Sequence, residues 1–350
     1  MDLFRAKKLS RIIYSKVHST ASIAFIATNL TGLFKRNLPI ILSLILFLVI
    51  FYIRFQQGGW EFDLDLFPNM RESLDKRISQ TLPSPQAELL SGILLGNKKD
   101  LPYDLKLALR DSSTLHIVVV SGQNLTLLAA LFMSLSGILK RKVAILISIL
   151  AVIFYTLLTG AQIPVLRAAV MAILAFLAQI FGRERDGIRI LIITAGVFLL
   201  INPKWLLELS FNLSFFATFG VIAVAPLIKK HLEVLPLILK EDIAISIGAQ
   251  LMVAPLIAQT FHQLSIVSIL ANILVGWTIP FIMIFGTITL IFPILSILPN
   301  VLLTYFIFVT KFFASLPFAW VYFGEKIWIF WVGYYILLGG VLLALRKRRD

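Results

Sequence analysis

The chain has 350 residues, of which 59% are hydrophobic and only 14% are charged. Soluble domains are about 45–50% apolar and about 25% charged, so this composition and the mean hydropathy of +0.93 exclude a water-soluble globular protein. The absence of cysteine excludes disulfides, thiolate metal sites and cysteine nucleophiles. There is no P-loop or GxGxxG motif, so ATP-driven transport by this chain alone is not expected.

The charge of the chain is strongly positive. Lysine and arginine number 32 against 18 acidic residues, which gives a formal net charge of +14. Cytoplasmic loops of membrane proteins hold basic residues at the anionic inner leaflet. Membrane topology is therefore the first explanation of this excess, ahead of nucleic-acid binding. Only four histidines are present, and no two lie close in sequence. We therefore expect no metal, no cofactor and no enzymatic activity.

The first third of the chain divides into three segments. Residues 1–37 carry seven basic residues and are expected to be cytoplasmic or interfacial. The apolar run 38–53 is predicted to be the first transmembrane helix, and Pro39 suits its first turn. Residues 54–112 hold nine of the 18 acids, and this polar segment is expected outside the cytoplasm, with part of it forming helices that lie on the membrane.

From residue 113 onward, apolar runs follow one another closely. Because a bilayer crossing needs roughly 20 apolar residues, 113–345 is predicted to be a transmembrane domain, followed by a basic tail at 346–350. The fold class is an all-α polytopic integral membrane protein with about ten transmembrane helices, some broken or re-entrant. The stretch 264–299 is either split or re-entrant. The runs are 113–139, 143–159, 163–181, 190–201, 205–228, 243–261, 264–286, 288–310 and 327–345.

The distribution of basic residues predicts the orientation. With the N-terminus inside, 20 of the 32 basic residues fall in inner segments and 11 fall in outer segments. This asymmetry places both termini in the cytoplasm. The remaining basic residue, Arg167, lies inside an apolar run.

Polar residues within the apolar runs are the candidates for function, because an unsatisfied polar group in hydrocarbon costs several kcal/mol. The first group lies between His116 and Asn124, where Ser121, Gly122 and Gln123 interrupt an apolar run. One interpretation is a broken helix, non-helical at 121–124, whose backbone faces a polar cavity. The other is a continuous helix that uses Gly and Ser for close packing. His116 is either a satisfied buried or interfacial side chain or a proton carrier.

The second group surrounds Arg167. Gly160 ends one apolar run, Pro164 suits the first turn of the next, and Arg167 follows about one turn later. An intramembrane arginine is a functional hypothesis by default, and snorkelling to the interface is the alternative. We predict that Arg167 faces the bundle interior near residues 121–124, with Glu208 as its most plausible protein partner.

Two further groups complete the set. Ser210, Ser214 and Thr218 share one helix face, while Glu208 and Asn212 form a second pair that points roughly the opposite way. Packing and a polar path explain these stripes equally well.

The last group contains two prolines and two amides. Pro255 and Pro280 are expected to kink their helices and to free carbonyl groups. With Gln250 and Asn272 nearby, they indicate a bundle with a polar interior.

Four ordered blocks lie between residues 88 and 290. They are ELLSGILLGN…LRDSSTLHIVVVSGQNL (88–125), TGAQIPVLRAAVMA (159–172), LSFNLSFFATFG (209–220) and APLIAQTFHQLSIVSILANILVGWTIP (254–280). Together they resemble the competence domain of ComEC-type DNA-uptake proteins. The resemblance implies a polytopic channel that passes one DNA strand across the cytoplasmic membrane during natural transformation.

The chain departs from the family pattern at several points. Members commonly carry a second histidine at the position of Asn124, and many carry glutamine at the position of Asn212, so family-like roles are not carried over to these two residues. Full-length members often have an OB-like domain and a C-terminal metallo-β-lactamase-like domain. Here only 56–87 is available for the first, and the chain ends at Asp350 without the second. Nuclease activity is therefore expected from another protein.

The resulting hypothesis is a channel for single-stranded DNA, a polyanion that a wet polar path with positive elements would accept regardless of sequence. The expected partners are single-stranded DNA and the lipid bilayer, with a separate nuclease and a cytoplasmic helicase as further candidates and the oligomeric state open. The alternatives are a secondary transporter of a small solute and a non-conducting scaffold for a soluble nuclease or helicase. The candidate path residues are His116, Ser121, Gly122, Gln123, Asn124, Gly160, Pro164, Arg167, Glu208, Ser210, Asn212, Ser214, Gln250 and Asn272.

Overall fold

The structure is a computed structural model that describes most of the chain after residue 41. The chain divides into two compact units, one containing the helix Leu42–Gln57 with residues 199–203, and the other containing residues 61–198 and 204–350. The predicted basic segment 1–37 and the last three residues of the predicted tail lie outside the described residues. The described residues are Leu38, 42–58, 64–97, 100–118, Val120, 122–181, 186–234, 236–324 and 328–347.

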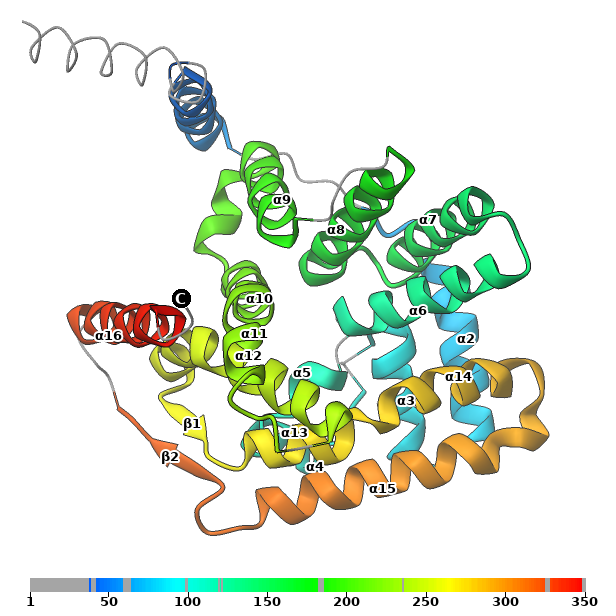
Figure 1. The fold of residues 1–350 in the computed structure, drawn as a ribbon. Coiled ribbons are helices and arrows are strands. Elements are labelled where there is room, and N and C mark those ends of the chain that lie inside the picture. The colour runs from blue at the N-terminus through cyan, green and yellow to red at the C-terminus, as the bar shows by residue number, and fades with distance from the viewer. Residues whose placement is uncertain are drawn as a thin grey trace, which may run out of the picture. The chain divides into compact units, whose positions relative to one another are not determined.

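The described part of the chain is almost entirely helical (Figure 1). The one sheet among these residues is a short antiparallel ribbon of β1 (Gln263–Ser265) and β2 (Trp320–Tyr322), with Leu264 opposite Val321. The helices in chain order are α2 (Pro68–Thr81), α3 (Gln86–Leu95), α4 (Tyr103–Asp111), α5 (Leu115–Val118), α6 (Gly122–Ser134), η1 (Leu135–Gly137), α7 (Arg141–Leu158), α8 (Ile163–Ile180), α9 (Gly187–Ile201), η2 (Pro203–Leu207), α10 (Leu209–Phe219), η3 (Gly220–Val224), α11 (Ala225–Lys229), α12 (Leu237–Phe261), α13 (Ser268–Gly276), α14 (Thr278–Ile291), η4 (Pro293–Ser296), α15 (Ile297–Ala314) and α16 (Trp328–Lys347).

In the first unit, an arginine side chain caps the end of a helix. The predicted first transmembrane helix, 38–53, corresponds to the helix Leu42–Gln57. Near its end, Arg54 donates hydrogen bonds from Nε to the carbonyl of Leu200 at 3.2 Å and from Nη2 to that of Ile201 at 2.9 Å. These carbonyls close α9, whose last turn has no partners within the helix. A cation at a helix C-terminus also complements the helix dipole.

Most predicted apolar runs coincide with helices, but the predicted number of crossings is not confirmed. Among the described residues, five helices are long and apolar enough to cross a membrane, or six if the bent pair α13–α14 is one span. The predicted boundary at Thr287 is wrong, because α14 continues through this residue to Ile291. The Thr287 hydroxyl donates to the carbonyl of Met283 one turn earlier, so a polar residue is accommodated without a break.

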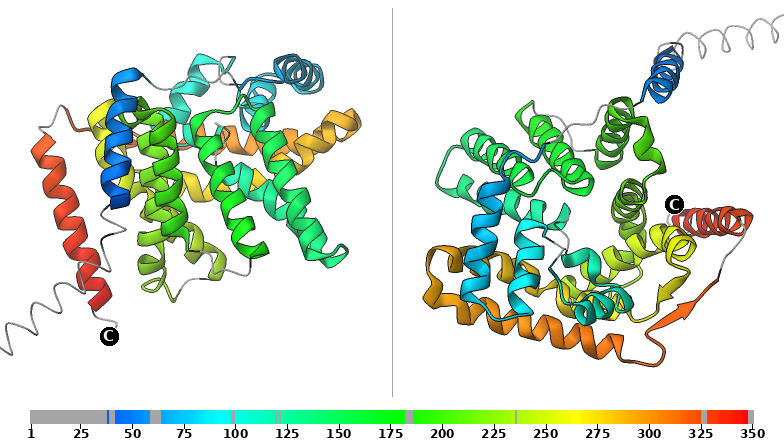
Figure 2. Two further views of the ribbon diagram at one scale, coloured as in Figure 1. Left: turned by 90° about the horizontal axis from the view of Figure 1, so that it is seen from above. Right: turned by 180° about the vertical axis from the view of Figure 1, so that it is seen from behind.

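The helices α14 and α15 run crosswise to α7, α8 and α12 (Figures 1 and 2). The chain bends by 41° between α13 and α14 at Trp277, and Pro280 lies in the first turn of α14, where its missing N–H removes no helical hydrogen bond. This bend agrees with both interpretations of 264–299, a split span and a re-entrant segment.

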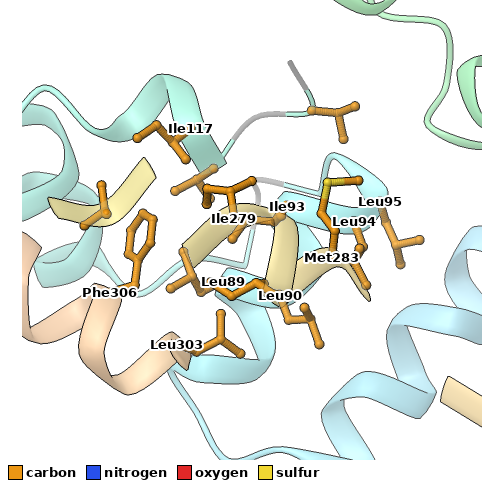
Figure 3. Close-up of a cluster of buried hydrophobic side chains, with 14 of the residues drawn as sticks. Leu89, Leu90, Ile93, Leu94, Leu95, Ile117, Ile279, Met283, Leu303 and Phe306 are labelled. Atoms are coloured by element: carbon orange, nitrogen blue, oxygen red, sulfur yellow. The ribbon is translucent and has the colours of Figure 1, made fainter. Parts of the chain in front are cut away.

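The core of the second unit is centred on α3, a helix in the segment that the sequence marks as polar. Leu89 and Ile93 are fully buried, and they pack with Ile279 of α14 and Phe306 of α15 (Figure 3). Eight of the ten residues of α3 are buried. Within the expected polar segment 54–112, α3 is thus a core helix that packs with α14 and α15.

Two glycines bring α10–α11 and α12 into backbone contact. A Cβ atom added at Gly220 would lie 2.2 Å from the carbonyl oxygen of Gly248, and one added at Gly248 would lie 2.8 Å from that of Gly220. Gly220 begins η3, a π-helical turn that joins α10 to α11. The two helical segments approach each other this closely only because neither glycine carries a side chain.

The last helix, α16, donates hydrogen bonds to backbone carbonyls of α12 next to a proline. Pro255 lies inside α12 and has no N–H, so the carbonyl of Leu251 loses its helical partner. The hydroxyl of Tyr334 donates to this carbonyl at 2.9 Å, and that of Tyr335 donates to the carbonyl of Met252 at 2.8 Å. The aromatic hydroxyls of α16 thereby satisfy backbone groups that no water reaches inside a bilayer.

We predict that Gly248→Ala destabilises the folded protein, because the new methyl group overlaps backbone atoms of the neighbouring helix. Overpacking of this kind costs about 1–3 kcal/mol or more. Thermal unfolding of the detergent-purified protein measures the effect. Gly333→Ala is the matched control, because an added Cβ there meets nothing within 4 Å. Equal stability of the two variants would contradict the close contact.

We also predict that Tyr334→Phe destabilises the protein by about 1 kcal/mol, because it leaves the Leu251 carbonyl without a donor. In a Pro255→Ala background the loss should shrink, since alanine at this position restores the helical N–H. A double-mutant cycle of unfolding free energies measures the coupling. The same loss in both backgrounds would show that Tyr334 does not act through the carbonyl that Pro255 leaves without a helical partner.

Candidate functional site

The predicted helix break is present, but it lies earlier than the sequence analysis placed it. α5 ends at Val118 and α6 begins at Gly122, with buried Val120 between them. Gly122, Gln123 and Asn124 form the first turn of α6, so the prediction that they are non-helical is wrong. Ser121 lies outside the described residues. The first turn of a helix leaves backbone N–H groups without carbonyl partners, and this turn carries the polar residues of the motif.

The break is supported by α3, which packs directly against it. A Cβ atom at Gly92 would lie 2.7 Å from a side-chain carbon of Val118, and one at Gly96 would lie 3.3 Å from a side-chain carbon of Val120. Asn124 is buried, and its amide donates to the carbonyl of Ile93 in the last turn of α3 at 3.0 Å. Asn124 therefore satisfies a backbone group at a helix end.

Arg167 faces the helix-packed interior, as the sequence predicts. Its side chain is 7% exposed, and Nε donates to the hydroxyl of Ser214 at 2.5 Å. Nη1 donates to the hydroxyl of Thr218, which itself donates to the carbonyl of Ser214 at 2.9 Å. The predicted face of α10 thus binds the guanidinium through two hydroxyls one turn apart. Snorkelling of this side chain to the interface is inconsistent with these contacts.

The predicted pairing of Arg167 with Glu208 is wrong. Glu208 is exposed and immediately precedes α10, and within the described part of the chain no carboxylate forms an ion pair with Arg167. The other neighbours of the guanidinium are the sulfur of Met171, 3.6 Å from Nη1, and the ring of Phe215, 5.8 Å from Cζ. A buried cation with only neutral partners retains its full charge, and such a group requires a functional or structural explanation.

The other predicted site residues divide between this cluster and positions away from it. Gly122 lies against Arg167, because a Cβ added there would be 3.2 Å from Nη2. His116, Gln123, Glu208 and Ser210 are exposed.

The amide side chains have separate surroundings. Asn212 donates to the carbonyl of Leu206 at 2.8 Å, which holds η2 against α10. Gln250 on α12 and Asn272 on α13 are partly buried, and no hydrogen bond between described residues joins them to Arg167. The Asn272 carbonyl oxygen is buried and has no hydrogen-bond partner among these residues.

Sequence reasoning missed the residues that hold the α7–α8 turn. Arg71 of α2 binds both carboxylate oxygens of Asp65, at 2.7 and 2.5 Å, and donates to the carbonyl of Leu158 at 3.3 Å. Gly160 adopts φ +75°, and a Cβ there would lie 3.0 Å from the Arg71 guanidinium. Pro164 then lies in the first turn of α8, three residues before Arg167. The sequence carries no signal for a contact between residues 87 positions apart.

The described residues offer no obvious metal ligand set. No three histidine, aspartate or glutamate side chains among them lie together in a way that could hold a metal ion. The site therefore consists of a buried cation, two hydroxyl groups and the start of a helix.

Comparison with known proteins identifies the family. The profile of the family described as Competence protein matches residues 93–348, which is more than half of the chain. The chain belongs to the competence protein family. The matched region contains α5, α6, α8 and α10, and hence every residue that contacts the Arg167 guanidinium.

Three relatives show similarity over part of their length. ComE operon protein 3 of Bacillus subtilis is 27% identical over 239 residues, which is 64% of this chain and 30% of that protein. Uncharacterized protein YcaI of Escherichia coli is 25% identical over 207 residues, which is 55% of this chain and 27% of the relative. An uncharacterized protein of Aquifex aeolicus is 27% identical over 173 residues, 48% and 41% of the two chains. The matched regions span well under half the length of these relatives. No solved structure matches the chain.

We predict that part of the stability of this competence protein is lost in acid through Asp65. The hydrogen bond and charge of Arg71 hold the pKa of the Asp65 carboxyl below its ordinary value of 3.8. Because the pKa is lower in the folded chain, the ion pair contributes stability above this ordinary value and loses it as the pH falls further. Thermal unfolding measured from neutral pH to about pH 3 should therefore show a drop below about pH 4.

The Asp65→Asn variant should be less stable at neutral pH and should lack this part of the acid-dependent loss. Asp104→Asn is the control, because Asp104 is exposed in the first turn of α4 and has no ion-pair partner among the described residues. Parallel pH profiles for wild type and Asp65→Asn would refute the assignment.

Proposed function

We propose that the protein is a membrane channel that passes single-stranded DNA across the cytoplasmic membrane during DNA uptake, and that it is not itself an enzyme. Membership of the competence protein family and the apolar membrane-spanning helices support this function. The observation that carries it furthest is Arg167, a buried cation whose partners among the described residues are all neutral.

An uncompensated cation in the bundle interior suits a polyanionic substrate. Its attraction for a phosphate does not depend on the base attached, which a channel for DNA of any sequence requires. Ser214 and Thr218 fix the guanidinium without neutralising it. A carboxylate partner would have cancelled this charge, and a small neutral solute would have given no reason to keep it.

The proposed orientation places both termini in the cytoplasm. The crosswise helices α14 and α15 share a core with α3, which lies within the expected outer segment. We therefore assign α13–α15 to a re-entrant layer on the outer side instead of two of the ten expected crossings, although η4 and α15 together are long and apolar enough to cross a membrane. Of the remaining expected crossings, α7, α8, α10–α11 and α12 are long and apolar enough to span. The others are Leu42–Gln57, α5–α6, α9 and α16. The even total of these crossings keeps both termini on one side, in agreement with the basic inner segments.

The channel assignment predicts that both Arg167→Gln and Arg167→Lys reduce DNA uptake, by roughly tenfold or more for the glutamine variant. The lysine variant keeps the positive charge. It loses the planar guanidinium, which hydrogen-bonds two hydroxyls and has a third nitrogen besides. The measurement is uptake of labelled DNA by transformable cells that carry the variant as their only copy. Membrane levels of each variant are measured in parallel.

Arg189→Gln is the matched control, since Arg189 is 82% exposed and pairs with Asp186 at the start of α9. Normal uptake by Arg167→Gln at normal membrane levels would overturn the channel role of this residue. Strand passage by the purified protein in vesicles then separates a channel from a scaffold, because a scaffold alone would conduct no DNA.

A further inference from the structure

Three consecutive cations stand where α7 begins. Lys140 immediately precedes α7, Arg141 and Lys142 are its first two residues, and all three are exposed. Arg141 donates from Nη2 to the side-chain oxygen of Gln179, a neutral group in the last turn of α8, at 3.2 Å. No carboxylate in the described part of the chain forms an ion pair with any of the three. This basic turn (140–142) therefore carries three positive charges that no described residue neutralises.

Helix stability does not explain these charges. A helix N-terminus carries a partial positive charge and favours acidic side chains, yet the first turn of α7 has none. Other cations at the helix ends are balanced. Arg189 in the first turn of α9 pairs with Asp186, and Lys229 ends α11 and pairs with Glu241. The charges of the basic turn therefore require a partner that comes from outside the helix.

Large apolar side chains adjoin the basic turn. Ile138 is 87% exposed, and Phe181, at the end of α8, is 74% exposed. Leu146 and Leu150 are also exposed, and they follow Lys142 at intervals of four residues along one face of α7. The helices α7 and α8 lie side by side (Figure 1). Positive charge thus meets an exposed apolar surface, an arrangement that matches the boundary between phospholipid headgroups and acyl chains.

We propose that the basic turn binds the headgroup of an anionic phospholipid, whose acyl chains cover Leu146 and Leu150. The ammonium groups of Lys140 and Lys142 donate to the phosphate oxygens, and the lipid supplies the negative charge that the chain does not. Because Arg141 joins the start of α7 to the end of α8, the bound lipid stabilises both helices at this end of the unit. The inference does not depend on the proposed channel function.

The apolar residues distinguish this lipid from a DNA strand, which carries the same phosphodiester chemistry. An acyl chain removes Ile138 and Leu146 from water, and burial of apolar surface is favourable. The backbone of a DNA strand has no comparable apolar group. The observed combination of charge and exposed aliphatic side chains therefore favours the lipid.

The test is native mass spectrometry of the full-length protein in a maltoside detergent, which contains no phosphate. The protein is titrated with phosphatidylglycerol, which is anionic, and with phosphatidylcholine, which has no net charge. We expect saturable binding of phosphatidylglycerol. The double variant Lys140→Gln and Lys142→Gln should bind this lipid roughly tenfold or more weakly, because each basic residue near an anionic lipid contributes to its attraction. Equally tight binding of phosphatidylcholine would overturn the proposal.

The matched control is the double variant Lys76→Gln and Arg77→Gln. It removes the same charge from two exposed residues of α2 and should bind phosphatidylglycerol as the wild type does. An equal loss in both double variants would show attraction by net charge alone, and the specific site would be withdrawn. The variant Lys140→Arg and Lys142→Arg keeps both charges and should retain binding.

The glutamine variant removes cations from a helix N-terminus, so its thermal stability should not fall. If it nevertheless does not fold, Lys142→Gln alone takes its place, with an expected loss of several-fold. Normal phosphatidylglycerol binding by either folded variant would contradict the site.

A fluorescent oligothymidylate tests the other source of phosphate. It should not displace phosphatidylglycerol from the wild-type protein. If it displaces the lipid and also binds the Lys140→Gln and Lys142→Gln variant more weakly than the wild type, the basic turn belongs to the DNA strand. The lipid proposal then fails, while the proposed channel function stands.

Discussion

The structure depends on one constraint, which is that backbone groups freed at the ends and breaks of apolar helices must find donors within the chain. Each of four such places has a dedicated side chain. Arg54 caps the end of α9, Arg71 the end of α7, and Asn124 the end of α3, while Tyr334 donates to the carbonyl freed by Pro255. In water these carbonyls would be solvated and the side chains dispensable. In hydrocarbon the donors determine where a helix is able to stop.

Arg167 differs from the other two arginines in what its guanidinium contacts. Arg54 and Arg71 bind carbonyl oxygens, and Arg71 also binds a carboxylate, so their charges are balanced by helix ends or by an ion pair. Arg167 binds two hydroxyls on the face of α10, which provide hydrogen bonds without opposing charge. Arg54 and Arg71 therefore stabilise the fold, whereas the charge of Arg167 meets no opposing charge among the described residues.

Apolar periodicity and length predicted much of this arrangement. The runs 143–159 and 163–181 correspond closely to α7 and α8, and the spacing of Ser214 and Thr218 identified the face that binds Arg167. The break near Gly122 was also visible, because glycine among polar residues inside an apolar run is typical of one.

Other features were beyond sequence reasoning for physical reasons. The short apolar stretch of α3 lies in the polar segment 54–112, and no local pattern reveals the tertiary contacts that bury it. Glu208 was chosen as the partner of Arg167 on expected depth alone, and depth does not specify the direction of a side chain. Donor–acceptor pairs such as Asn124 with Ile93 or Arg71 with Leu158 join residues far apart in the chain, so no local pattern reveals them.

The glycine contact between Gly220 and Gly248 has a mechanical consequence. Where two helices meet backbone to backbone, no interlocking side chains are available to absorb a small relative shift, and displacement of one helix is passed directly to the other. Thr218 lies just before this junction and holds Arg167, whereas Gly248 lies halfway along α12. A displacement of α12 would therefore be transmitted through this contact to the segment that carries Ser214 and Thr218, whose hydroxyls hold the Arg167 guanidinium. The position of this buried cation is thus set by the packing of α12 as well as by α10.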